Sequence, residues 1–129
     1  MIHIDPRSST PIYEQIIKQF KELCVKGIIK PGEKVPSVRE LSTMIVANPN
    51  TVSKAYKELE RVGILETLRG KGTFVSEVFQ MTMDEEKAIM IKEQLKEIVI
   101  DALYTGINIE DIQIWLSEIQ QEMRGGMDA

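Results

Sequence analysis

Side chains able to contact nucleic acid are concentrated in two short stretches of this 129-residue sequence. Residues 48–54, Asn-Pro-Asn-Thr-Val-Ser-Lys, bring amide, hydroxyl and ammonium groups together. Such groups hydrogen-bond to base edges and to phosphates. Residues 69–72, Arg-Gly-Lys-Gly, place two cations on a glycine-rich turn, which suits contact with phosphates or with the minor groove. The chemistry indicated is recognition of nucleic acid.

Catalytic chemistry is not indicated. The single histidine, His3, falls in an N-terminal segment that we expect to be mobile. We find no nucleophile paired with a base, no spacing of metal ligands and no phosphate-binding loop. Residues 69–73 are rich in glycine, but they lack the strand-to-helix context of a phosphate-binding loop. The sequence therefore predicts a protein that is not an enzyme, with no cofactor and no metal site.

Two short helices are predicted to position the first stretch. Ser37 and Glu40 form a capping box that begins a helix ending near residue 45. Asn48 then caps a second helix with Pro49 at its first position, and Gly63 ends it. The apolar residues at helical spacing are Val38, Leu41 and Ile45 in the first helix and Val52, Ala55, Tyr56, Leu59 and Val62 in the second.

A longer helix and a hairpin are predicted to flank this pair. Thr10 and Pro11 read as the start of a helix whose apolar stripe runs to about Lys26, with Gly27 as its end. Cys24 lies among the apolar positions of that helix, where a buried, inert thiol is favoured over a thiol sensor. An extended piece with a turn at Pro31-Gly32 follows. Residues 64–68 and 73–75 read as two strands joined by the cationic turn.

This order of elements predicts a mainly α protein with a small β-hairpin, in the form of a winged helix-turn-helix domain. Its second short helix is the expected recognition helix, with its polar N-terminal end in the major groove. The candidate DNA contacts are Ser37, Arg39, Asn48, Asn50, Thr51, Ser53, Lys54, Arg69, Gly70, Lys71 and Gly72. Capping alone explains Ser37 and Asn48 equally well, and Gly70 and Gly72 are also explained by turn geometry.

Charge is distributed unevenly along the chain. Residues 1–76 carry 12 Lys and Arg against 8 Asp and Glu, a net charge of +4, whereas residues 77–129 carry 4 against 12, a net charge of −8. A basic front half suits contact with nucleic acid, although chance variation in surface charge gives the same pattern. One cysteine, no secretory signal and no long apolar run indicate a cytoplasmic protein without a membrane span.

The back half reads as two amphipathic helices. Thr82 and Glu85 form a second capping box, Gly106 ends the long helix that follows, and Asn108 with Asp111 begins another. Two helices of this size bury little apolar surface by themselves, so we expect the same helices of a second chain to complete the core. The residues assigned to that interface are Ile91, Leu95, Ile98, Ala102, Ile112, Trp115, Leu116 and Ile119. The alternative is packing onto the front half.

The front half resembles the winged helix-turn-helix domain of the GntR family of bacterial transcription regulators. The resemblance rests on Gly-x-x-x-Pro-Gly-x-x-x-Pro-Ser-x-Arg-Glu-Leu over residues 27–41, Asn-Thr-Val-x-x-Ala-Tyr-x-x-Leu from residue 50, and Gly-x-Gly-Thr-Phe-Val from residue 70. The short back half and the sequence Asn-Pro-Asn-Thr-Val make the chain similar to the YtrA subfamily. Many family members carry arginine where this chain has Pro49, so the resemblance implies no operator sequence.

The resemblance implies a transcription regulator, a repressor, that binds double-stranded DNA as a homodimer. It implies DNA contact by Arg39, Thr51 and the residues around Gly72, with residues 1–76 as the DNA-binding domain and residues 77–129 as a short two-helix dimerisation domain. An inverted-repeat operator follows from the two-fold symmetry of such a dimer. Larger members hold a small-molecule effector in the C-terminal domain. Here the back half is too short for such a pocket, so an effector would lie at the dimer interface or bind a different protein. The alternative function is a winged-helix module that binds proteins and not DNA.

Overall fold

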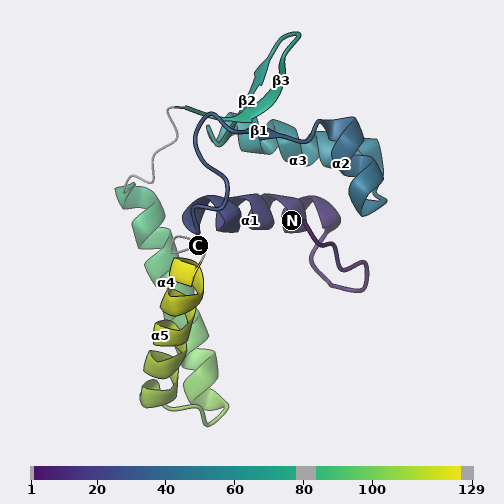
Figure 1. Ribbon diagram of the computed structural model, residues 1–129. Helices are drawn as coiled ribbons and strands as arrows, with labels where there is room; N and C mark the ends of the chain where they lie inside the picture. The colour runs from purple at the N-terminus through teal and green to yellow at the C-terminus, as the bar shows by residue number, and fades with distance from the viewer. Residues whose placement is uncertain (1, 78–83, 126–129) are drawn as a thin grey trace. The chain divides into compact units, whose positions relative to one another are not determined.

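The computed structural model describes residues 2–77 and 84–125, which form two compact units (Figure 1). Residues 2–77 form the first unit and residues 84–125 the second. Each unit is described separately below. Within the described ranges, no helix combines the length and the apolar character needed to cross a membrane.

The first unit contains three helices and a three-stranded sheet. The helices are α1 (Ile12–Val25), α2 (Val38–Ile45) and α3 (Pro49–Arg61), and the strands are β1 (Lys34–Val35), β2 (Leu65–Leu68) and β3 (Gly72–Val75). The sheet is antiparallel with the order β1-β3-β2, so that the β2–β3 hairpin forms a wing beside α3 (Figure 1). The winged helix-turn-helix prediction is confirmed.

The third strand, β1, was not predicted. Its two residues pair with β3 in the register Lys34 to Phe74 and Val35 to Thr73. The sequence predicts only an extended piece there, because two residues are too few for an alternating pattern. The pairing comes from β3, which offers a free strand edge to the chain leading into α2.

The core of the first unit lies between α1, α2, α3 and the sheet. The fully buried large side chains are Phe20, Ile16, Leu41, Leu59, Val52 and Val75. Phe20 and Tyr56 pack edge to face with ring centroids 5.7 Å apart, a favourable geometry for aromatic pairs. The Tyr56 hydroxyl donates to the carbonyl of Pro36, 2.5 Å away, and burial raises its pKa. The assignment of Tyr56 to the core is confirmed.

The N-terminal segment is held against α1, contrary to the expectation that it is mobile. Ile2 is buried in the core. The Gln15 side chain accepts from the Asp5 N–H and donates to its carbonyl, with both bonds 2.9 Å long. The Gln19 side chain exchanges the same pair of bonds with the backbone of His3. The carboxamides of two glutamines one helical turn apart thus hydrogen-bond to the backbone of the N-terminal segment.

The start of α1 also differs from the prediction by one residue. Pro11 and not Thr10 is the N-cap, and no side chain caps the helix. The Thr10 carbonyl instead accepts from the Gln15 side chain, at 2.8 Å.

The turn between α2 and α3 contains a strained residue. Val46 adopts a left-handed conformation, with φ 53° and ψ 55°, and is the one non-glycine residue of the described ranges with positive φ. A left-handed conformation costs a residue with a Cβ roughly 1–2 kcal/mol, and β-branching makes Val46 a true outlier. The side chain gains no burial in return, since it is 91% exposed.

Val46→Gly is therefore expected to stabilise the protein. Relief of the strain outweighs the roughly 0.5–1 kcal/mol that glycine loses in unfolded-state entropy, so a net gain of about 0.5–1 kcal/mol is expected in urea-induced unfolding. Val46→Ala keeps a Cβ and should recover less. A loss of stability in the glycine variant would mean that this turn does not hold the left-handed conformation in solution.

The second unit is an α-hairpin formed by α4 (Glu85–Tyr104) and α5 (Ile109–Gly125). Asp84 is the N-cap of α4 and accepts from the N–H groups of Glu86 and Lys87. The prediction that a capping box at Thr82 begins this helix is therefore wrong, because the helix begins after Asp84. Thr82 itself lies outside the described residues. Gly106 has φ 94° after α4, and the Asn108 side chain accepts from the Asp111 N–H at 2.9 Å. Both of these predictions are confirmed.

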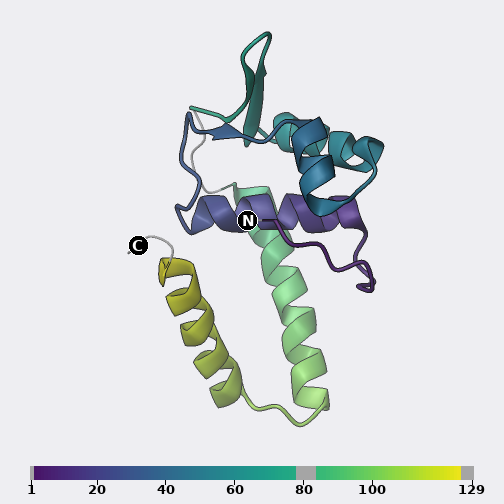
Figure 2. The same ribbon diagram turned by 45° about the vertical axis from the view of Figure 1, so that its right-hand side comes forward.

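The second unit has almost no core of its own. Among the described residues of α4 and α5, only Ala102 is buried. In Figure 2 the two ribbons lie apart along their whole described length. Ile91, Ile98 and Leu116 are 62%, 62% and 53% exposed, so the predicted apolar stripes are present but unburied.

Candidate nucleic-acid interface

The first turn of α3 presents polar groups to solvent. Asn48 caps the helix by accepting from the Asn50 N–H at 2.8 Å, and Pro49 occupies the first position. The carboxamide of Asn50 is exposed, and Ser53 is half-buried on the same side of the helix. With 3.6 residues per turn, this side lies opposite the buried residues Val52 and Leu59. The N-terminal end of α3 can therefore meet an external surface with hydrogen-bonding groups.

Two residues of α3 are placed differently from the prediction. The Lys54 ammonium lies 3.9 Å from the centroid of the Tyr13 ring of α1, a cation–π contact. Thr51 is half-buried and at the side of the polar face, and its N–H donates to the Asn48 carbonyl. Both side chains are therefore less available to DNA than their positions in the sequence predict.

Lys57 is a candidate that the site prediction left out. It is exposed and lies seven residues after Asn50, so that both project from the same side of α3. The signal was present in the sequence, but a lysine with no motif around it reads as a solvated side chain. Arg61 shares that side but is occupied, since its Nε donates to Glu58 at 2.9 Å. That hydrogen bond also lowers the pKa of the Glu58 carboxyl.

The start of α2 combines a complete cap with a free cation. The Ser37 hydroxyl accepts from the Glu40 N–H at 3.1 Å, and the Glu40 carboxylate accepts from the Ser37 N–H at 3.2 Å. Hydrogen bonds with Ser37 lower the pKa of the Glu40 carboxyl. Arg39 is exposed at the second helical position, and no carboxylate of the described residues lies within 4.0 Å of it. The capping role of Ser37 is confirmed, and Arg39 is available to an external anion.

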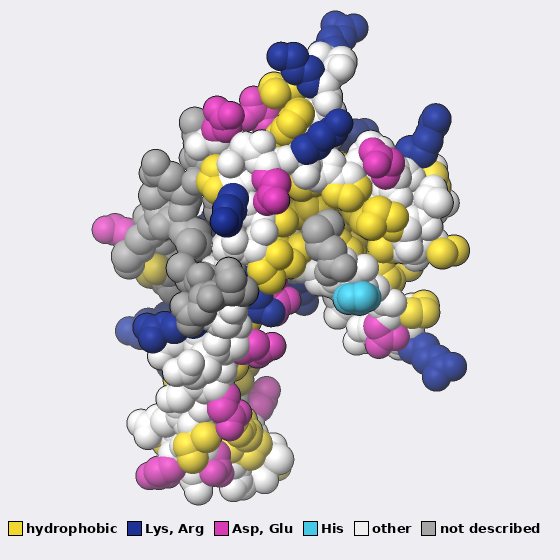
Figure 3. All heavy atoms as spheres, in the orientation of Figure 1, with side chains coloured by type: hydrophobic (Ala, Val, Ile, Leu, Met, Phe, Trp, Pro, Cys, Tyr) yellow, Lys and Arg dark blue, Asp and Glu magenta, His cyan; other side chains and the backbone are white. Residues whose placement is uncertain are grey.

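The wing carries its cations at the tip. Gly70 and Gly72 have φ of 79° and 123°, a region that only glycine adopts without strain. A Cβ on Gly72 would also lie 2.9 Å from the Lys34 side chain. Arg69 and Lys71 are exposed, and Lys and Arg side chains project from the tip of the β2–β3 hairpin in Figure 3. The two glycines thus make a tight turn that presents two cations.

The remaining sequence candidates do not form a second site. Cys24 is buried, and burial raises the pKa of its thiol, which lowers the thiolate fraction. Within residues 2–77 and 84–125, no three His, Cys, Asp and Glu side chains come together as a metal-binding group would require.

Known proteins share this arrangement. The model of the family "Bacterial regulatory proteins, gntR family" matches residues 12–75, the span from α1 to β3. The HTH-type transcriptional repressor YtrA of Bacillus subtilis (strain 168) is 66% identical over 126 residues, which cover 98% of this chain and 97% of that protein. The chain belongs to the GntR family. It is therefore a DNA-binding transcription regulator and not an enzyme.

Solved structures extend the similarity to both units. A crystal structure described as a transcriptional antiterminator from Listeria monocytogenes EGD-e is 43% identical, with a TM-score of 0.85 over 95% of this chain and 92% of that chain. The DNA-binding domain of AraR, solved in complex with operator ORE1, is 29% identical, with a TM-score of 0.50 over 57% of this chain and 89% of that domain. The second of these structures contains operator DNA bound to a domain that resembles the first unit.

Proposed function

We propose that this GntR-family regulator is a repressor that binds an inverted-repeat operator as a homodimer. The observation that carries the proposal is the pairing of an exposed polar and cationic surface on the first unit with unburied apolar stripes on the second. The first surface suits a DNA half-site, and the second suits another copy of the chain. Repression is inferred from the 66% identity to the repressor YtrA, and such a protein acts in the bacterial cytoplasm.

The proposed DNA surface, called here the DNA face, comprises the ends of three elements of the first unit. The N-terminal turn of α3 provides Asn50 and Ser53 for base edges, and backbone N–H groups at helix starts favour phosphates. Arg39 of α2 and the wing tip provide cations for the DNA backbone. The residues assigned to the DNA face are Ser37, Arg39, Asn48, Asn50, Thr51, Ser53, Lys57, Arg69, Gly70, Lys71 and Gly72. Lys54 is placed at its edge, because Tyr13 holds its ammonium.

The proposed dimer interface, called here the seam, uses one stripe of each helix of the second unit. The seam comprises Ile91, Leu95, Ile98 and Ala102 of α4 with Ile112, Trp115, Leu116 and Ile119 of α5. Ala102 is buried and Ile112 is half-buried, but the other six side chains are exposed. Exposed apolar side chains gathered on one side of a helix mark an interaction site. Two copies related by a two-fold axis would bury it in a four-helix bundle.

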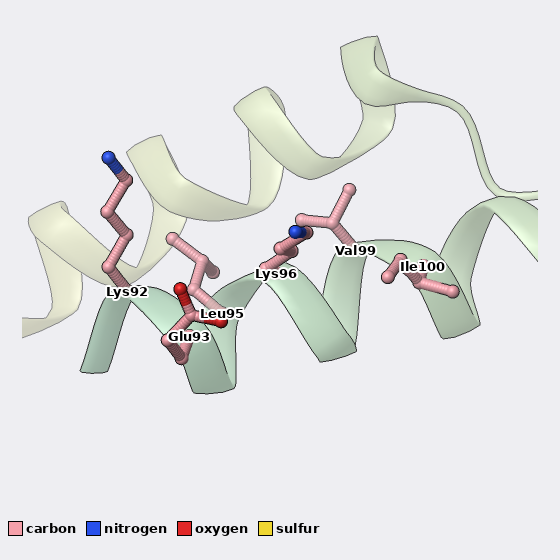
Figure 4. Close-up of a pocket in the computed structure, with 6 residues that line it drawn as sticks. All are labelled: Lys92, Glu93, Leu95, Lys96, Val99 and Ile100. Carbon is pink, nitrogen blue, oxygen red and sulfur yellow. The ribbon is translucent and has the colours of Figure 1, made fainter. Parts of the chain in front are cut away.

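A small-molecule effector would bind where two chains meet. One groove on α4 has a volume of about 500 Å³ and is lined by α4 alone among the described residues, so one chain provides only one wall (Figure 4). Ligand sites usually bury most of the ligand surface. A second chain would close this groove, which favours an effector site at or beside the seam.

Binding to duplex DNA is expected to depend steeply on salt, which tests the proposed DNA face. Arg39, Lys57, Arg69 and Lys71 of two chains would release about eight counterions, and even six contacts weaken binding roughly 10³-fold between 50 and 200 mM salt. Mobility shift or fluorescence anisotropy over that range measures the slope. An affinity that stays flat would rule out a phosphate-binding face.

A further inference from the structure

Two lysines lie along one side of the seam on α4. Lys92 and Lys96 are one turn apart and line the groove beside Leu95 and Val99 (Figure 4). Both are exposed, and among the described residues no carboxylate lies within 4.0 Å of either. With about 100° of rotation per residue, Lys92 lies roughly 90° and Lys96 roughly 130° clockwise of the middle of the seam when α4 is viewed from its N-terminus.

Three carboxylates lie along one side of the seam on α5. Asp111, Glu118 and Glu122 recur at spacings of seven and four, and they lie roughly 75–115° anticlockwise of the seam in the same view. Within the described residues, none of them has a cation within 4.0 Å. The clockwise strip of α4 and the anticlockwise strip of α5 are thus opposite in sign. The anticlockwise side of α4 carries Glu97 and Asp101 instead, which are also exposed and unpaired among the described residues.

The handedness of the helices decides where these strips can meet. When two helices pack seam to seam in antiparallel directions, the clockwise side of one faces the clockwise side of the other. The lysines of α4 and the carboxylates of α5 within one hairpin are therefore on opposite sides of the contact and cannot pair. When the two helices run parallel, the clockwise side of one faces the anticlockwise side of the other, and the strips coincide.

We propose that α4 packs parallel to α5 of a second copy, with Lys92 and Lys96 facing Glu118 and Glu122 of the partner subunit. This inference rests on the proposed homodimer and specifies its arrangement. Flanking charges of this kind determine partner choice and orientation in helical bundles. Residues 84–125 carry 4 Lys and Arg against 10 Asp and Glu, so the lysine strip offsets part of the repulsion between two acidic copies.

The arrangement has a consequence for DNA binding. If α4 is parallel to the partner's α5, then the two α4 helices are antiparallel and the two-fold axis is perpendicular to them. The chains then enter the bundle from opposite ends. The 20 residues of α4 span about 30 Å, which is close to the separation of about 34 Å between half-sites one helical turn apart.

A charge exchange between two variants tests the pairing. Lys92→Glu with Lys96→Glu, and separately Glu118→Lys with Glu122→Lys, should each weaken the homodimer at least tenfold in sedimentation equilibrium. An equimolar mixture should recover wild-type affinity as a heterodimer, because both strips are again complementary. The matched control, Glu86→Lys with Glu97→Lys, reverses two exposed charges of α4 on the side away from the lysines and should leave the dimer intact.

The outcomes separate this inference from the proposed function. A monomeric wild-type chain would overturn the homodimer itself, whereas a dimeric wild type without recovery on mixing would overturn only the charge pairing. Spin labels at Tyr104→Cys in a Cys24→Ala background give a second measurement. Turns at opposite ends of the bundle predict a distance of about 30 Å between labels. Labels within about 10–20 Å would place both turns at one end and contradict the arrangement.

Discussion

Ile98→Asp is expected to convert the protein into a monomer and to abolish tight binding to an inverted repeat. Ile98 lies in the middle of the α4 stripe and is 62% exposed in the single chain, so the change costs little before association. In the dimer, each copy would bury an unpaired carboxylate, which costs several kcal/mol per ion. Loss of the linkage between two DNA faces should reduce operator affinity by roughly 10²- to 10⁴-fold.

The control for this variant is Ile114→Asp. Ile114 lies on the side of α5 away from the seam and is 57% exposed, so it receives the same charge without entering the interface. Sedimentation should give a monomer for Ile98→Asp and a dimer for Ile114→Asp, with binding to a single half-site retained by both. A dimer that survives Ile98→Asp would move the interface away from the seam.

The double substitution Arg39→Ala with Lys71→Ala is expected to weaken operator binding by roughly 10²-fold or more, at about 1–3 kcal/mol for each charged contact. The two side chains come from separate elements, α2 and the wing, and both are exposed without an ion-pair partner among the described residues. Their removal should change the free energy of unfolding by no more than about 0.5 kcal/mol each.

A matched variant removes charge without touching the DNA face. Lys18 is exposed on the outer side of α1, opposite the buried residues Ile16 and Phe20, and Lys30 is exposed in the loop before β1. Lys18→Ala with Lys30→Ala should leave affinity nearly unchanged. Equal losses in the two double variants would mean that general charge accounts for binding, and a sharp drop in the melting temperature of the first would mean that it is structural.

Features set by local chemistry could be predicted from the sequence. The capping box of Ser37 and Glu40, the cap at Asn48 and the left-handed Gly63 depend on residues within a few positions of each other. The core of α3 follows from helical spacing around Val52 and Leu59. These signals place the recognition helix and the wing without knowledge of any long-range contact.

Features set by tertiary contact could not be predicted in this way. Strand β1 exists because β3 pairs with it, and the N-terminal segment is ordered because Gln15 and Gln19 bind its backbone. Lys54 looks free in the sequence, but it packs on Tyr13, which is 41 positions earlier. The left-handed conformation of Val46 could not be predicted from residue propensity, because valine is disfavoured at positive φ.

Selection of binding sites from a random duplex library by the full-length chain tests the central claim most directly. The account predicts enrichment of inverted repeats whose half-site centres are separated by about one helical turn, about 34 Å, or by a multiple of it. A selected complex should contain two chains per duplex. Enrichment of a single unrepeated site, of direct repeats, or of no sequence would contradict a two-fold symmetric regulator that reads DNA with α3 and the wing.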